Sequence, residues 1–133
     1  TIYYLKNTNT SENSDLRSNR VVIYHYVIGN DDSYSYLSDQ FIISDPTNIE
    51  GETLILLFEE FLPKLKSEYL GISIEGGVAT VMFKGGASKY ISEATPGVSS
   101  KYTNSINKTL LQFNSIKKVQ YSIDGKVITD WDA

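Results

Sequence analysis

Residues Ile106–Lys126, INKTLLQFNSIKKVQYSIDGK, decide the fold that this sequence predicts. Its first part, which includes Ile106, Leu110 and Phe113, has apolar residues at the spacing of a helix end. Its second part alternates as a strand, with Val119, Tyr121 and Ile123 on one face. Asp124-Gly125 then favours a tight hairpin turn, because both residue types tolerate positive φ angles. The stretch therefore predicts an amphipathic helix, a strand and a short hairpin arm.

Apolar residues that recur every three or four positions predict two helices. The first helix starts near Glu50 and Glu52, whose charge suits a helix N-terminus, and Pro63 should kink or end it near Leu62. The second helix has an apolar stripe that consists of Val98, Tyr102, Ile106, Leu110 and Phe113. Its N-terminal cap is open among Ser99, Ser100, Thr103 and Asn104.

The other regular segments are predicted to be strands. Val21–Ile28 is a β-branched and aromatic run, and Tyr36–Ile43 is a further extended candidate. Leu70–Glu75 and Val78–Phe83 flank Gly76-Gly77, which is typical of a hairpin. The order β-α-β-β-α-β predicts an α+β fold, with a small mixed β-sheet and two helices packed on one face.

The chain is predicted to hold one domain. With 133 residues, 41% of them hydrophobic, it can bury a single core. Residues 1–20 are expected to be a flexible N-terminal arm or tether, because Lys6–Arg20 is rich in Asn, Ser and Thr, although Thr1–Leu5 is strand-like. Residues 21–129 would form the domain, and residues 130–133 a C-terminal tail.

Composition narrows the classes of function. The net charge is −4 and only two of the twelve basic residues are arginine, which argues against nucleic-acid binding. The absence of cysteine excludes disulfides, thiolate metal sites and cysteine nucleophiles. No apolar run approaches the roughly 18–20 residues of a membrane span. The chain begins at Thr1, so any signal peptide or lipid-attachment cysteine is expected upstream.

Enzymatic chemistry is not indicated. His25 is the only histidine, and within an alternating strand we expect it to be a structural or surface residue rather than a catalytic base. Gly85–Lys89 lacks the spacing of a phosphate-binding loop, and a flexible turn is expected there. We therefore expect no enzyme activity, no cofactor and no metal.

Three acidic pairs occur, and none has the spacing of a calcium-binding loop. Weak cation binding is an alternative at Asp31/Asp32 only. Glu59/Glu60 are expected on the solvated face of the first helix, and Asp130/Asp132 on the C-terminal tail.

Three segments in a fixed order resemble the germane (GerMN) domain family. They are Gly71–Phe83, GISIEGGVATVMF, then Thr109–Phe113, TLLQF, and Lys117–Gly125, KKVQYSIDG. Val21–Tyr26 fits the opening strand of the family and Leu54–Leu62 its first helix. The resemblance covers most of Val21–Val127 and leaves the N-terminal arm outside.

The resemblance implies an extracytoplasmic bacterial domain of the kind found in lipoproteins and in sporulation or spore-germination proteins. Such a domain would be held at the cell membrane by an upstream anchor or would lie in the spore envelope. The implied fold is similar to the ring-building domains of sporulation channel proteins, and no catalytic residues are implied. The sequence departs from the family pattern in Tyr34–Phe41 and in Lys84–Gly97, where we expect its specific features.

Apolar residues on both faces of two strands favour binding. Two helices can cover only one face of a sheet, so the other face would present Tyr24, Tyr26, Val81 and Phe83 to a partner. The alternatives are that Thr1–Leu5 or the tyrosine-rich connection covers that face, or that these strands simply have mixed burial.

Two functional hypotheses follow. The leading one is a non-enzymatic interaction domain that binds an envelope protein or cell-wall component, with self-association as a narrower form. The other is a small-ligand receptor in which Tyr34, Tyr36 and Tyr90 line a loop pocket for sugar or peptide fragments.

Overall fold

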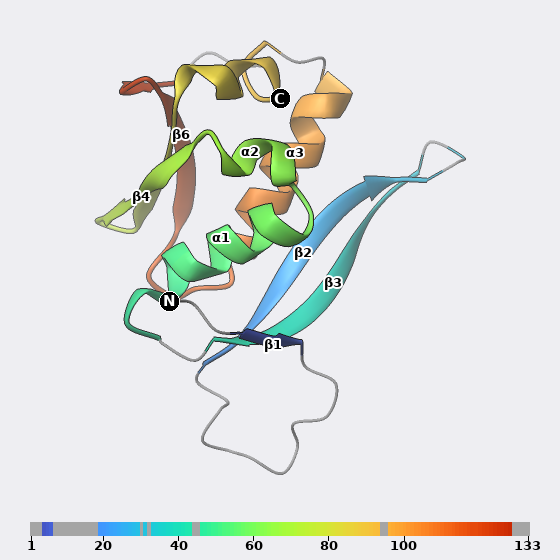
Figure 1. Ribbon diagram of the computed structural model, residues 1–133, viewed down its shortest axis with the longest axis vertical. Helices are drawn as coiled ribbons and strands as arrows, with labels where there is room; N and C mark the ends of the chain where they lie inside the picture. Colours follow the sequence, from blue (N-terminus) through green and yellow to red (C-terminus); the bar gives the residue numbers. More distant parts are fainter. Residues whose placement is uncertain are drawn as a thin grey trace.

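The computed structural model describes residues 4–6, 19–29, 31, 33–43, 46–93 and 96–128, and arranges them in two β-sheets with three α-helices (Figure 1). The predicted α+β class is confirmed. The strands, however, are divided between two sheets instead of forming the single sheet that the sequence pattern suggested. Residues 130–133 and most of the expected N-terminal arm lie outside the described residues.

The first sheet is antiparallel and has the order β1-β3-β2. It consists of β1 (Tyr4–Lys6), β2 (Arg20–Ile28) and β3 (Tyr34–Ile43). The strand predicted over Val21–Ile28 is confirmed. The extended candidate Tyr36–Ile43 belongs to the full strand β3. Together β2 and β3 form a long hairpin that projects beyond the helices (Figure 1). Strand β1 lies within the expected N-terminal arm, so part of that arm belongs to a sheet.

The second sheet has the order β4-β5-β6-β7 and is mixed, because β5 and β6 run parallel while the other pairs are antiparallel. Its strands are β4 (Tyr69–Glu75), β5 (Val78–Phe83), β6 (Lys118–Ile123) and β7 (Lys126–Val127). Both predicted hairpin turns are confirmed by positive φ angles, which are 56° and 83° at Gly76 and Gly77, and 51° and 81° at Asp124 and Gly125.

The helices are α1 (Ile49–Glu60), α2 (Pro63–Lys66) and α3 (Pro96–Leu110). Pro63 stands at the start of α2, so it ends α1 as its lack of an N–H predicts. Short 3₁₀ helices cover Pro46–Asn48 and Gly85–Lys89. Helix α3 begins before all four residues that were considered as its cap, so none of them caps it.

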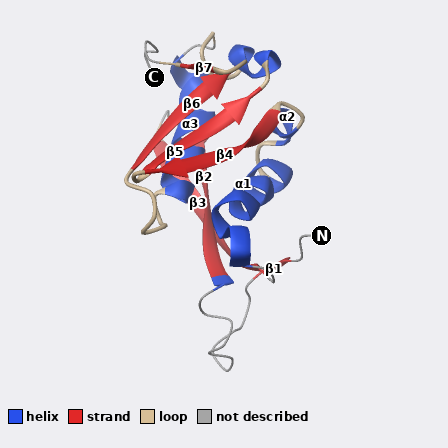
Figure 2. Ribbon diagram, turned by 90° about the vertical axis from the view of Figure 1, so that its left-hand side faces the viewer, coloured by secondary structure: helices blue, strands red, loops and turns tan. Residues whose placement is uncertain are grey.

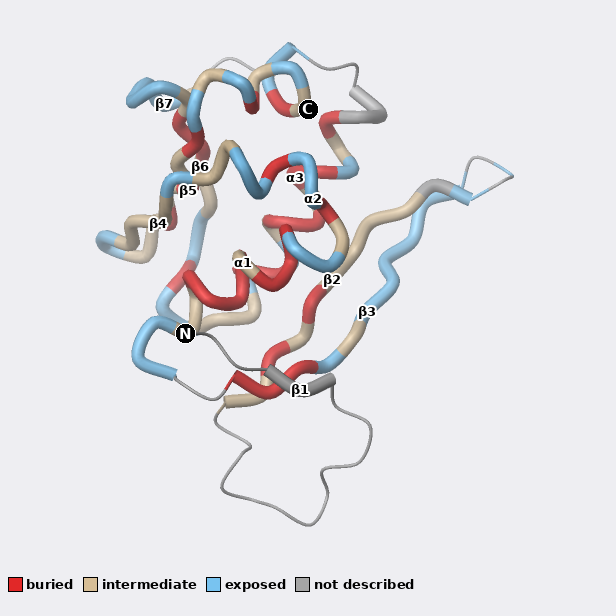
Figure 3. Tube along the Cα trace, viewed as in Figure 1, coloured by how far each residue is buried: buried red, intermediate tan, exposed pale blue. Residues whose placement is uncertain are grey.

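The core lies where α1 and α3 pack between the two sheets (Figures 1 and 2). Helix α1 contributes Phe58, whose ring lies 6.0 Å from that of Phe83 in β5. Helix α3 meets the same face of this sheet at Tyr121 of β6, whose hydroxyl donates to the Thr103 carbonyl over 3.3 Å. Both helices thus cover one face of the second sheet, and the base of the hairpin is buried as well (Figure 3).

The prediction that Val81 and Phe83 lie on an uncovered sheet face is wrong. Val81 and Phe83 both have 0% of their surface exposed. They alternate with Val78, Thr80 and Met82, which are half-buried, and therefore point to the face that the helices cover. They are core residues and cannot reach a partner.

Gly85–Lys89, the glycine-rich segment after β5, packs against the rest of the domain, whereas the sequence suggested a flexible turn. Ala87 and Ile91 are buried, and the Lys84 N–H donates to the Glu68 carbonyl over 2.8 Å. The 3₁₀ helix in this segment therefore belongs to the core.

Candidate functional site

Polar side chains of α3 hold the outer edge of β2. The Ser105 hydroxyl accepts the N–H of Tyr26 over 2.9 Å, and the Thr109 hydroxyl accepts that of Tyr24 over 3.0 Å. The two side chains are four positions apart on one helix face, and the N–H donors that they accept are two positions apart on one strand edge. The helix therefore replaces a neighbouring strand.

Gln112 extends this contact at the base of the hairpin. Its side-chain oxygen accepts the Val22 N–H over 3.0 Å, and its nitrogen donates to the Val22 carbonyl over 2.7 Å. One amide group thus makes both hydrogen bonds that a paired strand would make. Thr109 and Gln112 belong to the TLLQF segment, in which the sequence pattern assigned a structural role only to the apolar Leu110 and Phe113. The polar side chains of Thr109 and Gln112 were the sequence signal that could have indicated this contact with β2.

This docking presents a group of four tyrosines on the outer face of the hairpin, here called the tyrosine cluster. The ring of Tyr26 lies 5.5 Å from that of Tyr34 and 5.0 Å from that of Tyr36. Tyr24 and Tyr36 are 6.3 Å apart in an edge-to-face contact. Tyr26 pairs directly with Tyr36 in the strand register, so close contact of their side chains is expected.

The tyrosine cluster is partly open to solvent. Tyr34 is 58% exposed, while Tyr24 and Tyr26 are half-buried. Burial raises the pKa of Tyr36, and the neighbouring Tyr26 raises it further, so its phenol stays protonated at neutral pH. The cluster therefore offers aromatic faces together with the neutral hydroxyl group of Tyr36.

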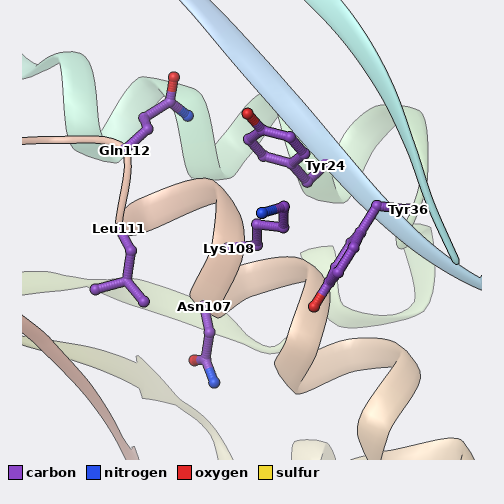
Figure 4. A pocket seen from close by; sticks show the side chains of 6 residues that line it. All are labelled: Tyr24, Tyr36, Asn107, Lys108, Leu111 and Gln112. Carbon is purple, nitrogen blue, oxygen red and sulfur yellow. The ribbon is translucent and has the colours of Figure 1, made fainter.

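A pocket of about 390 Å³ lies between the tyrosine cluster and α3 (Figure 4). The Lys108 ammonium lies 4.8 Å from the ring centre of Tyr24 and 5.1 Å from that of Tyr36, as in cation–π contacts. The pocket thus combines aromatic and apolar surface with one cationic donor. Its lining consists of Tyr24, Tyr36, Asn107, Lys108, Leu111 and Gln112.

Of the other candidates from the sequence, Tyr90 does not join this site. Its ring lies 5.4 Å from that of Tyr102 and 5.3 Å from the Lys89 ammonium, and it is not among the residues that line the pocket. Tyr34 and Tyr36 belong to a strand rather than a loop. The expected loop pocket of Tyr34, Tyr36 and Tyr90 is therefore replaced by a pocket in which Tyr36 meets Tyr24.

His25 lies on the face of β2 opposite the tyrosine cluster, because side chains alternate along a strand. Its ring is stacked on Phe61 at 4.7 Å. Burial lowers the pKa of His25, the charge of Lys101 lowers it further, and Asp39 partly opposes them. The imidazole is thus held neutral in a packed position.

The acidic pairs do not assemble into a metal site in the described part of the chain, where no three His, Asp or Glu side chains come together. Asp31 accepts the N–H and the hydroxyl of Ser33, over 3.1 and 2.6 Å, and these bonds lower the pKa of its carboxyl. Glu59 forms an exposed ion pair with Lys66 at 2.7 Å. Asp32, Asp130 and Asp132 lie outside the described residues.

The glycine-rich segment is also unsuited to phosphate. A Cβ atom added at Gly85 would meet the Asp124 carboxylate, and one added at Gly86 would meet that of Glu68. Two negative groups close to the backbone repel an anion. This geometry agrees with the absence of phosphate-loop spacing in the sequence.

Across the described ranges, no helix combines the length and the apolar character needed to cross a membrane.

Comparisons with known proteins give one kind of match. A family model described as Germane, sporulation and spore germination, matches residues 1–129. The matched range includes the first twenty residues, which the resemblance seen in the sequence left outside, and it therefore includes strand β1. Searches of curated proteins and of solved structures gave no match.

Proposed function

This chain belongs to the Germane family of sporulation and spore germination, and we propose that it acts there as a non-enzymatic domain that binds an envelope protein. The observation that supports this most is the tyrosine cluster on a projecting hairpin. Tyrosine is enriched in protein interfaces because it provides a large rigid surface and a hydroxyl group at little entropic cost.

The hairpin supports binding because it is both exposed and held in place. Tyr34 and Leu37, on its two faces, are 58% and 56% exposed. At the same time, hydrogen bonds to side chains of α3 fix the β2 edge at Tyr24 and Tyr26, and Gln112, just after α3, fixes it at Val22. A surface that is already ordered loses little conformational entropy when a partner binds.

The position of His25 supports a function without catalysis. It is separated from the pocket by the strand itself, and its ring is packed on Phe61 with a lowered pKa. A general base would instead need its imidazole within hydrogen-bonding reach of a bound substrate.

We also propose that the domain works outside the cytoplasm, attached to the membrane through a segment upstream of Thr1. The resemblance seen in the sequence implies this setting, and the family description, sporulation and spore germination, agrees with it. The upstream natural sequence tests it, because a signal segment ending in a lipid-attachable cysteine is expected. A cytoplasmic position in protease-accessibility experiments on intact cells would contradict it.

The binding proposal is tested by replacing Tyr34 and Tyr36 with alanine in the bacterium that encodes the chain. We expect fewer heat-resistant spores or slower germination, with an unchanged amount of folded protein. Leu70→Ala is the matched control, because Leu70 is 58% exposed but lies on β4. Normal sporulation and germination in the double variant would contradict the proposal.

A photo-crosslinking side chain at position 34 gives a second test, with position 70 as control. A specific envelope protein should be captured only at position 34. Equal capture at both positions would argue against the tyrosine cluster as the binding surface.

The pocket favours a second candidate function, the recognition of a cell-wall sugar or peptide fragment. Such fragments have faces that stack on Tyr24 and Tyr36 and oxygen atoms that accept hydrogen bonds from Lys108. Peptidoglycan disaccharide-peptides at saturating concentration should raise the melting temperature of the wild type and not of Lys108→Ala. No shift with the wild type would exclude this candidate and leave protein binding through Tyr34 untouched.

A further inference from the structure

The pocket between the tyrosine cluster and α3 holds a positive charge without a counter-charge. The Lys108 ammonium lies between the side chains of Tyr24 and Tyr36, 4.8 and 5.1 Å from their ring centres (Figure 4). Among the residues that the structure describes, none with an acidic side chain lines this pocket, and none forms an ion pair with Lys108. The Tyr36 hydroxyl adds no negative charge at neutral pH, because burial raises its pKa. The pocket is therefore suited to an anion.

The two amide side chains of the pocket have their oxygen atoms occupied within the protein. The Gln112 oxygen accepts the Val22 N–H, and the Gln112 nitrogen donates to the carbonyls of Val22 and Thr109 over 2.7 and 2.6 Å. The Asn107 oxygen accepts the hydroxyl of Tyr121, so the NH₂ group of Asn107 is the part that remains for a ligand. A ligand thus meets donors here rather than amide oxygens.

The surroundings of Lys108 favour a singly charged anion. Lys108 lies in the last turn of α3, where the helix backbone carries a partial negative charge. That charge opposes a dianion such as phosphate, which proteins usually bind with arginine forks or with the N–H groups of a helix N-terminus. The described lining of the pocket offers neither. A carboxylate has one charge and two acceptor oxygens, which matches one ammonium and one NH₂ group.

An exposed leucine beside Lys108 indicates what accompanies the carboxylate. Leu111 lines the pocket and is 48% exposed, so a ligand that covers it removes apolar surface from water. Leu111 follows Lys108 by three positions, and residues at this spacing are neighbours on a helix surface, with Cβ atoms about 5–6 Å apart. A carboxylate and an apolar side chain lie this close together in the last residue of a peptide, where both are bonded to one Cα atom.

From these observations we propose that the pocket binds the free C-terminus of a peptide whose last residue is apolar. Lys108 pairs with the terminal carboxylate, Asn107 donates to it, and Leu111 packs against the last side chain. Tyr24 and Tyr36 hold the Lys108 ammonium through their ring faces and leave its N–H groups for the ligand. This inference rests on the second candidate function above and names the chemical group that the pocket recognises.

Isothermal titration with two forms of one peptide tests the carboxylate. N-acetyl-Ala-Ala-Leu with a free carboxylate should bind the wild type at least about tenfold more tightly than the same peptide with a C-terminal amide. Added salt should weaken the acid form only, because the amide makes no ion pair. Equal affinity of the two forms, or no binding of either, would overturn the proposal. A melting shift with disaccharide-peptides that does not depend on their terminal carboxylate would still support the second candidate function.

Variants of two lysines on α3 place the carboxylate. Lys108→Met keeps the length of the side chain without its charge, and should lower the affinity for the acid form about tenfold, to that of the amide form. Lys108→Arg should retain most of the binding. Lys101→Met is the matched control, because Lys101 also lies near a ring, 5.9 Å from the centre of Tyr102, but does not line the pocket. Equal losses in Lys108→Met and Lys101→Met would contradict the proposal.

Asn107→Asp changes the charge of the pocket while keeping a contact of the core. The introduced carboxylate can still accept the Tyr121 hydroxyl, so the melting temperature without peptide should stay close to that of the wild type. It should lower the affinity for the acid form about tenfold or more by repulsion and leave the affinity for the amide form unchanged. Unchanged binding of the acid form would overturn the proposal.

A third peptide identifies the source of the terminus in the same titration. A cell-wall stem peptide that ends in D-Ala-D-Ala presents the same carboxylate beside a smaller side chain of opposite configuration. Tighter binding of this peptide than of N-acetyl-Ala-Ala-Leu would identify the cell wall as the source. Tighter binding of N-acetyl-Ala-Ala-Leu would identify the C-terminus of a protein. Both results support recognition of the carboxylate.

Discussion

The two sheets use tyrosine in opposite ways. In the second sheet, Tyr121 is buried and its hydroxyl bonds to α3, and burial raises its pKa well above the ordinary value. Burial likewise raises the pKa of Tyr69 to about 12. In the hairpin, Tyr34 and Tyr36 are exposed. The same residue type is scaffold in one sheet and surface in the other, and the covering helices make the difference.

The largest effect is expected in the buried sheet. Phe83→Ala should lower the free energy of unfolding by about 3–5 kcal/mol, because the lost ring leaves a cavity beside Phe58 and Tyr69. Urea unfolding measures this. A loss below about 1 kcal/mol would show that this sheet is not the scaffold of the fold.

A direct comparison uses the same substitution in both sheets. Tyr121→Ala should cost about 3–5 kcal/mol of unfolding free energy, and Tyr34→Ala no more than about 1 kcal/mol. The reason is that Tyr121 is 3% exposed and Tyr34 is 58% exposed. Thermal and urea unfolding of the two variants measure these losses. Equal losses of unfolding free energy would contradict the different roles of tyrosine in the two sheets.

The junction between the two regions is tested at Gln112. Gln112→Ala should cost about 1–3 kcal/mol, because it leaves the N–H and C=O of Val22 without their partner. Gln120→Ala is the matched control, since that amide donates to a side chain, the Thr80 hydroxyl, over 2.8 Å and not to a strand edge. A larger loss at Gln120 would mean that the edge contact contributes little to stability.

The smallest effect is a dependence of stability on pH. The pKa of His25 is lowered in the folded state, so the unfolded chain binds a proton more tightly. This contribution to stability is therefore fully present above about pH 6.5, the ordinary histidine value, and is lost as the pH falls toward the folded pKa.

Melting temperatures between neutral pH and pH 5 measure this effect. His25→Phe keeps an aromatic ring against Phe61 and should remove part of the decrease on acidification. The effect should be modest, because His25 is only partly buried and remains close to Lys101 and Asp39. An identical pH profile in the variant would contradict the role of His25.

Local features of the fold were predictable from the sequence because they depend on nearest neighbours. Gly76-Gly77 and Asp124-Gly125 have the positive φ angles that their residue types tolerate, and Pro63 separates α1 from α2. The division into two sheets was not predictable in this way. It depends on which strands pair across long sequence distances, and strand alternation does not contain that information.

The candidate site was predicted in part for the same reason. Tyr24 and Val81 both alternate with other apolar residues, so their patterns look alike in the sequence. Only the position of the helices buries Val81 completely and leaves Tyr24 half-buried. Ser105, Thr109 and Gln112 bond a strand 79 to 90 residues away, and such contacts have no local signature.

These distances have a consequence for how the molecule is made. When β2 and β3 have been synthesised, the helix that closes the β2 edge does not yet exist, since Gln112 follows Val22 by 90 residues. From the end of β3 at Ile43, synthesis adds 69 residues to reach Gln112, so at about 5–20 residues per second the β2 edge waits roughly 3 to 14 seconds for its partners. A chaperone that acts during synthesis therefore meets the hairpin before its last helix is made.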